Sequence, residues 1–221
     1  MKLRVIWCFL LLFSAAASAS EPEAFERQGN IFYRGSDGGV SQLTRGTSFG
    51  EPRLSPNGRT VAFIRQDSYP TEEGELGATS LWIADLTRQT VRSLLRSRPS
   101  KDVAQDLTSF GKPIFSLDGG FVYIAAQAWA TSTAIHQVNV STGKTRFVVA
   151  GSLRGVLRNG PFRGFLVVNQ HRYHPAPDFG SYNPDFIVRP DGKEILRVPG
   201  TEVDDGRDRL WPWLKLKGWT L

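Results

Sequence analysis

Two stretches of the chain repeat one frame, and this frame decides the fold. Residues 49–64 read FGEPRLSPNGRTVAFI and residues 110–124 read FGKPIFSLDGGFVYI; both fit F-G-x-P-x-x-S-x-x-G-x-x-V without a gap. Asn57-Gly58 and Asp118-Gly119 supply the positive φ angles that hairpin turns need. The apolar run after each turn is typical of a strand buried on both faces. Each stretch therefore predicts a short strand, a tight turn and a longer core strand, and residues 156–169 form a weaker third copy.

A second kind of hairpin alternates with the first. Its four copies begin at Ile31, Leu81, Ile135 and Phe186, so that successive copies lie 50, 54 and 51 residues apart. A period near 50 residues with about four strands per unit is typical of β-propeller blades. The sequence therefore predicts an all-β chain built as a small propeller of about four blades.

These motifs resemble a known repeat. Pro52–Ile64 resembles the WD-like repeat of TolB-type proteins, in which a buried turn precedes the core strand; Leu81–Asp85 resembles its next strand and Asp37–Thr44 its edge hairpin. The resemblance covers roughly Asn30 to Pro199 and implies the fold. Similar repeats occur in the propellers of prolyl-oligopeptidase-like peptidases and of lyases, so the resemblance leaves the function open. It does not extend to the N-terminal α/β domain of TolB, for which Ser20–Gln28 is too short.

The length of the chain limits the number of blades. Residues 20–221 form one predicted domain, whereas six blades would need about 240–270 residues. Leu214 to Lys217 alternate between apolar and charged, which favours a strand in Leu210–Leu221 that completes the N-terminal half-blade and closes the ring. The alternative is an open arc that pairs with a second copy as a homodimer.

The N-terminus predicts export. Lys2 and Arg4 precede the apolar run Val5–Phe13, and Ala17-Ser18-Ala19 fits a cleavage site, so Met1–Ala19 is a predicted signal peptide and the mature protein is periplasmic or secreted. The run is too short for a membrane helix, and no integral span is expected after cleavage. The single cysteine, Cys8, is removed with it, which excludes disulfides and cysteine chemistry from the mature chain.

The charge of the chain argues against one class of partner. The formal net charge is +6 for all 221 residues and falls to +4 without Lys2 and Arg4. The basic residues are scattered rather than clustered, and an exported protein is separated from nucleic acid. We therefore expect no nucleic-acid partner.

The segment from residue 171 to 185 is the richest polar loop. His171, Tyr173, His174 and Asp178 are the candidate binding residues, and Asp185 ends the segment. Two histidines and a carboxylate could also hold zinc. The prolines within it favour an irregular insertion, and long loops on rigid scaffolds often carry function. We expect ligand contact here, without a metal or other cofactor.

Tryptophan residues gather near the C-terminus. Trp211 and Trp213 are candidate binding residues, with Trp219 close by. Clustered tryptophans can form an interface or a sugar-stacking surface. The alternative is that they pack the closing strand.

Three further features have simpler interpretations. Gly46–Gly50 spells G-x-S-x-G, but a nucleophile elbow needs a strand before it and a helix after it, and here hairpins flank it. The acidic insertion Ser68–Thr79 is expected to be a solvated loop. His136 lies in a strand pattern and is expected in the core or on a blade face.

These observations favour a non-enzymatic binding or scaffold protein of a bacterial-type cell envelope, with a protein or an envelope component as its partner. The alternative is a propeller hydrolase or lyase that acts on saccharide or peptide at residues 171–185. An enzyme should bring His171, His174 and a carboxylate together in one pocket. A binding module should show dispersed histidines and an aromatic rim.

Overall fold

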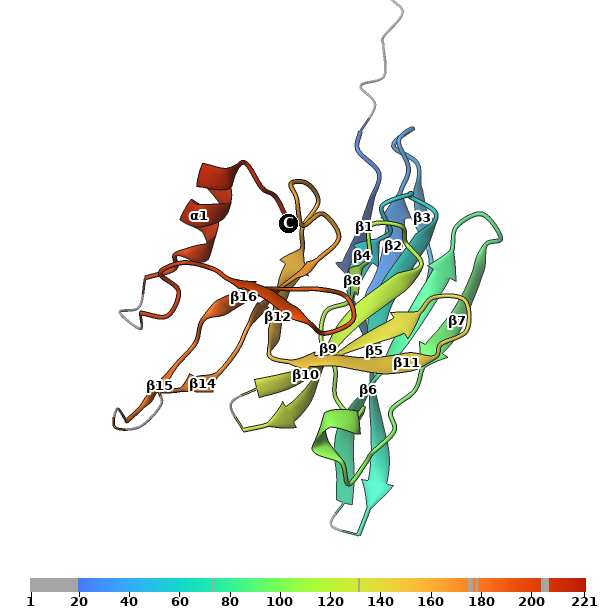
Figure 1. Cartoon of the computed structure of the whole chain (residues 1–221). Coiled ribbons are helices and arrows are strands. Elements are labelled where there is room, and N and C mark those ends of the chain that lie inside the picture. The colour runs from blue at the N-terminus through green and yellow to red at the C-terminus, as the bar shows by residue number, and fades with distance from the viewer. Residues whose placement is uncertain (1–19, 73, 131, 175–176, 178, 204–206) are drawn as a thin grey trace, which may run out of the picture.

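The computed structural model describes residues 20–72, 74–130, 132–174, 177, 179–203 and 207–221, and in this part the chain is almost entirely β (Figure 1). Four antiparallel sheets follow one another along the chain. Sheet 1 contains β1 (Glu23–Arg27), β2 (Asn30–Arg34) and β3 (Val40–Gln42); sheet 2 contains β4 (Phe49–Leu54), β5 (Thr60–Thr71), β6 (Gly74–Asp85) and β7 (Thr90–Leu95). Sheet 3 contains β8 (Ile114–Phe115), β9 (Phe121–Trp129), β10 (Ser132–Asn139) and β11 (Thr145–Ala150). Sheet 4 contains β12 (Ser152–Val156), β13 (Leu166–Asn169), β16 (Asp185–Val188) and β17 (Glu194–Arg197).

Four short elements complete the described fold. β14 (Arg172–Tyr173) and β15 (Ser181–Tyr182) form a small hairpin between β13 and β16. A 3-10 turn, η1 (Val103–Gln105), lies between sheets 2 and 3, and the helix α1 (Leu210–Lys217) follows sheet 4.

The repeated turns fold as predicted. Ser55 Oγ lies 2.7 Å from Asn57 Oδ1 and accepts from the N–H of Thr60 at 2.9 Å, which fixes the turn between β4 and β5. In the next sheet Ser116 Oγ lies 2.5 Å from Asp118 Oδ1 and accepts from the N–H of Phe121 at 3.0 Å. Residues 156–169 also join β12 to β13, so all three copies of the first hairpin and all four copies of the second are confirmed.

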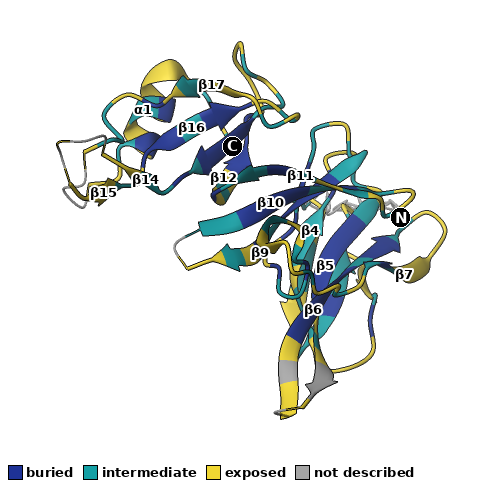
Figure 2. Cartoon of the chain, turned by 60° about the horizontal axis from the view of Figure 1, so that its bottom comes forward, coloured by how far each residue is buried: buried dark blue, intermediate teal, exposed yellow. Residues whose placement is uncertain are grey.

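Apolar clusters join neighbouring sheets in chain order. Ile31 packs with Phe63 between sheets 1 and 2, Ile83 with Ile124 between sheets 2 and 3, and Ile135 with Val168 between sheets 3 and 4. Figure 2 shows these buried residues along the middle of the strands, with exposed residues at the β14–β15 hairpin and at the far end of β5 and β6. Within the described residues no cluster joins sheet 4 back to sheet 1, so the four sheets form an open arc.

The predicted closing strand is wrong. Residues 210–217 form α1, with Leu210 and Leu214 buried against Leu157, Val167 and Ile187 on the outer face of sheet 4. Leucines four residues apart share one helix face, so the period of two in Leu214–Lys217 was coincidental. Gly218, with φ 66°, ends the helix in a left-handed cap. Among the described residues sheet 1 therefore has three strands, without a counterpart of β4, β8 and β12.

The acidic insertion is also not the loop that we expected. β5 and β6 pair from Thr60↔Asp85 through Thr71↔Gly74, so Ser68–Thr79 belongs largely to one long two-stranded ribbon. Ser68 Oγ donates to Glu75 Oε2 across this ribbon at 2.9 Å. The cross-strand pairing gives the polar backbone groups partners that a solvated loop would find in water.

The membrane prediction is tested only in part. No helix in the described ranges is long and apolar enough to cross a membrane. The predicted signal peptide, Met1–Ala19, lies outside the described residues.

Candidate functional site

The predicted polar loop forms the β14–β15 hairpin. His171 Nδ1 lies 3.0 Å from Asn183 Oδ1, and its ring meets Tyr173 edge to face with 5.0 Å between centroids. His174 instead stacks on Tyr182, 4.6 Å between centroids. Asp178 lies outside the described residues. The structure thus assigns the two histidines to different partners.

Within the described part of this hairpin, the two histidines do not converge with a carboxylate. The described part of the chain contains no group of three His, Cys, Asp or Glu residues arranged to hold a metal. Asp185 lies buried at the start of β16, where its carboxylate is 3.4 Å from Nε of Arg154. Burial raises the pKa of Asp185, and the charge of Arg154 opposes that shift.

The hairpin does present large exposed aromatic side chains. Tyr173 is 72% exposed and Phe179 is 97% exposed. Arg172, between the two histidines, instead turns toward the protein: it stacks over Phe186 at 5.3 Å and pairs with Glu194. The hairpin is therefore held at its base and presents exposed aromatic groups at its surface.

The two candidate tryptophans separate. Trp213 packs edge to face on Trp219, 5.1 Å between centroids, in the cluster beneath α1. Trp211 is 52% exposed. Side chains two residues apart on a helix do not face each other, which explains the split. Trp213 is a packing residue, and Trp211 alone is presented to solvent.

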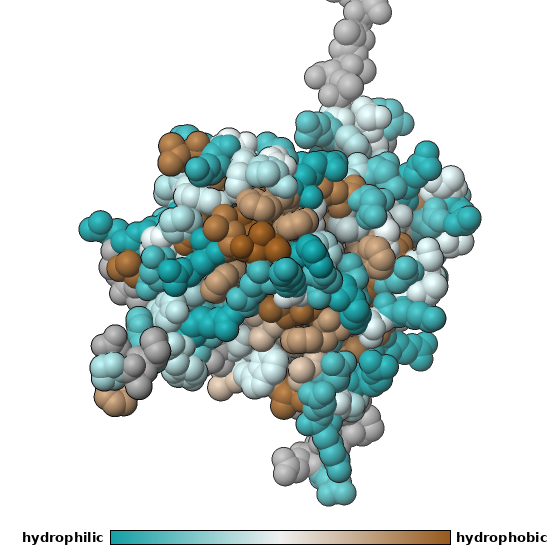
Figure 3. Space-filling model, in the orientation of Figure 1, coloured by the Kyte–Doolittle hydropathy of each residue, from teal (hydrophilic) through white to brown (hydrophobic). Residues whose placement is uncertain are grey.

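A cleft that the sequence did not reveal lies along the axis of the arc. It has a volume of about 840 Å³ and runs along the innermost strands β4, β8 and β12. Its wall is partly apolar, and Figure 3 shows apolar surface gathered near the C-terminal end of the chain, where Leu221 lines the cleft. The same wall carries one acidic side chain, that of Glu21. It also carries four cationic side chains, those of Arg53, Lys112, Arg154 and Arg158.

Backbone irregularities position two of these arginines. The pairing of β4 with β5 shifts register between Gly50 and Arg53, and Glu51 has a φ of 53°. The pairing of β12 with β13 shifts between Leu153 and Gly155, with Arg154 as the extra residue. A β-bulge redirects the side chains of its strand, and bulges are frequent beside functional sites. Both bulges place an arginine in the wall of the axial cleft.

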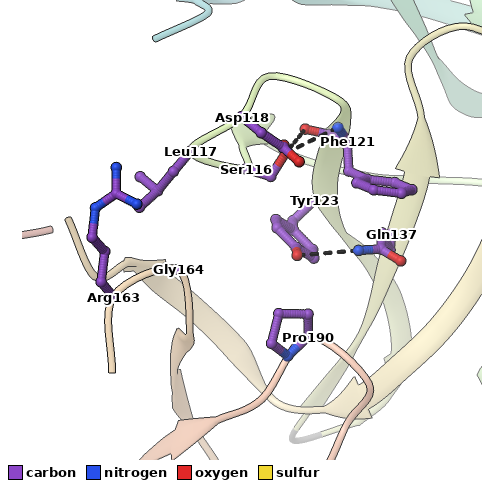
Figure 4. A pocket seen from close by; sticks show the side chains of 9 residues that line it. All are labelled: Ser116, Leu117, Asp118, Phe121, Tyr123, Gln137, Arg163, Gly164 and Pro190. Carbon is purple, nitrogen blue, oxygen red and sulfur yellow. Dashed lines mark hydrogen bonds between the residues drawn. The ribbon is translucent and has the colours of Figure 1, made fainter. Parts of the chain in front are cut away.

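A second cleft, of about 420 Å³, lies between sheets 3 and 4 (Figure 4). Tyr123 lines it and accepts a hydrogen bond from Gln137 Nε2 at 3.2 Å. Burial raises the pKa of Tyr123, so the phenol is neutral at pH 7. Asp118 is held by the hydroxyl of Ser116 and the N–H of Gly120, and the Ser116 hydroxyl lowers its pKa. Most polar groups of this cleft therefore already have partners.

The structure also places two further sequence features, the G-x-S-x-G segment and His136. Gly46–Gly50 leads into β4, which β5 follows, so the G-x-S-x-G segment lacks the helix of a nucleophile elbow. His136 is buried in sheet 3 beside Phe147, as predicted. Burial lowers the pKa of His136 and keeps the ring neutral.

Comparison with known proteins identifies the architecture. No family model matches the chain, and no curated protein matches it in sequence. Among solved structures, dipeptidyl peptidase 4 of Porphyromonas gingivalis aligns over 81% of this chain and 31% of its own, with a TM-score of 0.58 and 12% identity. The tricorn protease aligns over 80% of this chain and 15% of its own, with a TM-score of 0.52 and 16% identity. The chain has a β-propeller fold.

A third structure is the β-propeller domain of the Trilobed protease from Pyrococcus furiosus, which has an open velcro topology. It aligns over 78% of this chain and 48% of its own, with a TM-score of 0.49 and 16% identity. The chain spans less than half the length of each of these proteins. At such low identity the likeness concerns the fold alone.

Proposed function

We propose that this propeller is an exported, non-enzymatic binding or scaffold protein of a bacterial-type cell envelope, built from TolB-type repeats. The observation that carries the proposal is the separation of His171 and His174, which contact different aromatic rings and share no carboxylate among the described residues. A hydrolase or lyase at this loop would need an acid and a base near one reacting atom. The predicted signal peptide supports export, and the TolB-like motifs at Pro52–Ile64 support the repeat type.

The exposed aromatic residues supply contact groups for a partner. Tyr173 and Phe179 on the hairpin, and Trp211 on α1, project from the last sheet. Aromatic side chains are enriched at protein interfaces, where each buries a large area for few rotatable bonds. The open arc holds them on a rigid frame, as a scaffold requires.

Expression of the full chain in a bacterial host tests the proposal. N-terminal sequencing of the fractionated protein is expected to find a mature chain that begins at Ser20 in the periplasm or medium. A photo-crosslinking amino acid placed at Tyr173 or at Phe179 should then give the same discrete adduct. Arg88 is the matched control position, because its side chain is 80% exposed but lies on the β6–β7 turn of sheet 2.

Two results would contradict the proposal. The first is an unprocessed chain that stays in the cytoplasm, which would remove export. The second is cleavage of a saccharide or peptide that is lost in His171→Ala, which would favour the enzymatic alternative.

A further inference from the structure

The axial cleft holds more positive than negative charge. Of its four cations, Arg154 lies 3.4 Å from the carboxylate of Asp185. Within the residues that the structure describes, no carboxylate lies within 4 Å of Arg53, Lys112 or Arg158. Like charges in one partly enclosed space repel each other, so their retention in this wall is unfavourable without a counter-charge.

Arg53 is the most constrained of these cations. It follows the bulge at Glu51, which has a positive φ, a conformation that is uncommon outside glycine. The Nη1 atom of Arg53 donates a hydrogen bond to the carbonyl of Pro52 at 3.0 Å. Burial lowers the pKa of its guanidinium, while the charge of Glu51 opposes the shift. Strained backbone tends to persist where it positions a functional group. A second bulge, at Arg154 on β12, lies in another wall of the cleft.

Apolar residues form much of the remaining wall, beside Glu21 and Ser55. Residues of the same three inner strands line the cavity together with Leu221, and most of them also pack in the cores between the sheets: Leu54, Ile114, Phe115, Leu153, Val156 and Leu221. The volume of about 840 Å³ falls within the range of small-molecule pockets, about 300–1,000 Å³. An apolar wall with a few convergent charges recognises a ligand that has an apolar body and a charged group.

We propose that the axial cleft binds a small organic anion, whose phosphate or carboxylate oxygens bond to Arg53, Lys112 and Arg158 and whose apolar body packs against the leucine, isoleucine and valine side chains of the inner strands. The assignment rests on the proposed binding role and names the chemistry of its ligand. Arginine is well suited to such oxygens because its planar guanidinium donates two parallel hydrogen bonds.

A set of three probes with one apolar body tests the assignment: 2-naphthyl phosphate, 2-naphthoate and 2-naphthol. Fluorescence anisotropy is measured with the protein purified after expression of the full chain. At least one anion should bind about tenfold more tightly than the neutral alcohol, since a charge-assisted hydrogen bond contributes about 1.5–3 kcal/mol. Its affinity should fall between about 0.05 and 0.5 M salt, because the ions screen the charges. Preference between phosphate and carboxylate identifies which oxyanion the ligand carries.

Charge-matched variants locate the site. Arg53→Gln with Lys112→Gln should weaken binding of the anion about tenfold or more and leave 2-naphthol unchanged. Arg96→Gln with Lys144→Gln removes the same net charge from exposed positions outside the cleft and should leave both affinities within about twofold. Thermal unfolding of the first pair should not fall below that of the control pair, since removing mutually repelling cations does not weaken the fold.

The outcomes separate this inference from the proposed function. Equal affinity for 2-naphthol and both anions, or equal loss in both variant pairs, would overturn the anion site and leave the binding role intact. Release of 2-naphthol from 2-naphthyl phosphate would overturn the non-enzymatic role, while tight binding of 2-naphthoate in the same experiment would still support the anion site.

Discussion

The two ends of the arc are finished differently. At the C-terminal end, α1 covers the outer face of sheet 4, where Leu210 and Leu214 become buried. At the N-terminal end, sheet 1 has three strands, and its outer face carries Phe25 stacked on Phe32, 5.6 Å between centroids, with Arg34 over Phe25. Both rings remain partly exposed, and Val40 on the edge strand is 54% exposed. One end has a helix in the place of a neighbouring blade, whereas no described element covers the outer face of sheet 1, which we call the bare end.

This difference shows what a blade requires. A blade buries one face against each neighbour, so the last blade of an open arc has an apolar face without a partner. A short amphipathic helix can cover that face as well as another sheet. The ring therefore need not close for sheet 4 to have a complete core.

The largest effect should come from removing a buried leucine of the helix. Leu214→Ala leaves a cavity in the cluster beneath α1 and should lower the free energy of unfolding by about 2–5 kcal/mol, measured in urea. Leu216→Ala is the control on the same helix, because Leu216 is 81% exposed, and it should change stability by about 0.5 kcal/mol or less. Equal losses in the two variants would mean that the helix does not act as a cover.

A smaller effect should come from the glycines that join each end to the rest of the arc. Gly192 has a φ of 97°, and an added Cβ would lie 2.2 Å from the carbonyl oxygen of Val148. Gly29 has a φ of 70°, and an added Cβ would lie 2.4 Å from the carbonyl oxygen of Thr47. Each alanine variant should cost about 2 kcal/mol or more, from the left-handed backbone and the overlap together. Gly192→Ala should lower the main unfolding transition, whereas Gly29→Ala should mainly speed hydrogen exchange in sheet 1.

Gly58 provides the control for these glycines. It has a φ of 69° but no atom within 4 Å of an added Cβ. Gly58→Ala should therefore cost about 1–2 kcal/mol from the backbone alone. Protection that falls equally in all sheets of Gly29→Ala would show that the bare end is as firmly attached as the covered one.

The smallest effect concerns acid. The turn of sheet 3 contains Asp118, whose pKa is lowered by the Ser116 hydroxyl, whereas sheet 2, nearer the bare end, has the neutral Asn57 in the same contact. A lowered pKa gives stability that is present above about pH 3.9, the ordinary value for aspartate, and is lost as the pH falls. Asp118→Asn should therefore reduce the fall in urea midpoint between pH 7 and pH 3. An unchanged fall would assign the acid sensitivity to other carboxylates.

Local sequence was sufficient for most of the fold. Asn57-Gly58 and Asp118-Gly119 predicted their turns because few residues other than glycine readily adopt the positive φ that these turns need. The apolar runs that follow the turns are the core strands. The C-terminal helix was mistaken for a strand because an alternation over four residues also fits a strand. Leu210 and Leu214 lie four residues apart on one helix face, but that face has a partner only because the outer face of sheet 4 is free to receive it.

The candidate site was harder to predict for a physical reason. Its cations are far apart in sequence: Arg53 lies 59 residues before Lys112, and Lys112 lies 42 residues before Arg154. They line one cleft because each precedes or belongs to an innermost strand. Arg53 and Lys112 occupy variable positions of the repeated frame, so the frame does not mark them, and the bulges beside Arg53 and at Arg154 depend on pairing with the next strand. The histidine loop was conspicuous in sequence because its residues are adjacent, yet adjacency on a hairpin sent His171 and His174 to different neighbours.

The helix at one end also sets how copies of this chain can associate. A subunit with complementary free faces at both ends can add further subunits head to tail and grow into a filament. Among the residues that the structure describes, α1 occupies one of those faces, and the outer face of sheet 1 is the one left for a second blade. Two copies that met there would form a pair with twofold symmetry, in which the outer faces of both copies of sheet 1 would be buried. A helix of eight residues would thus limit such stacking to a pair of copies.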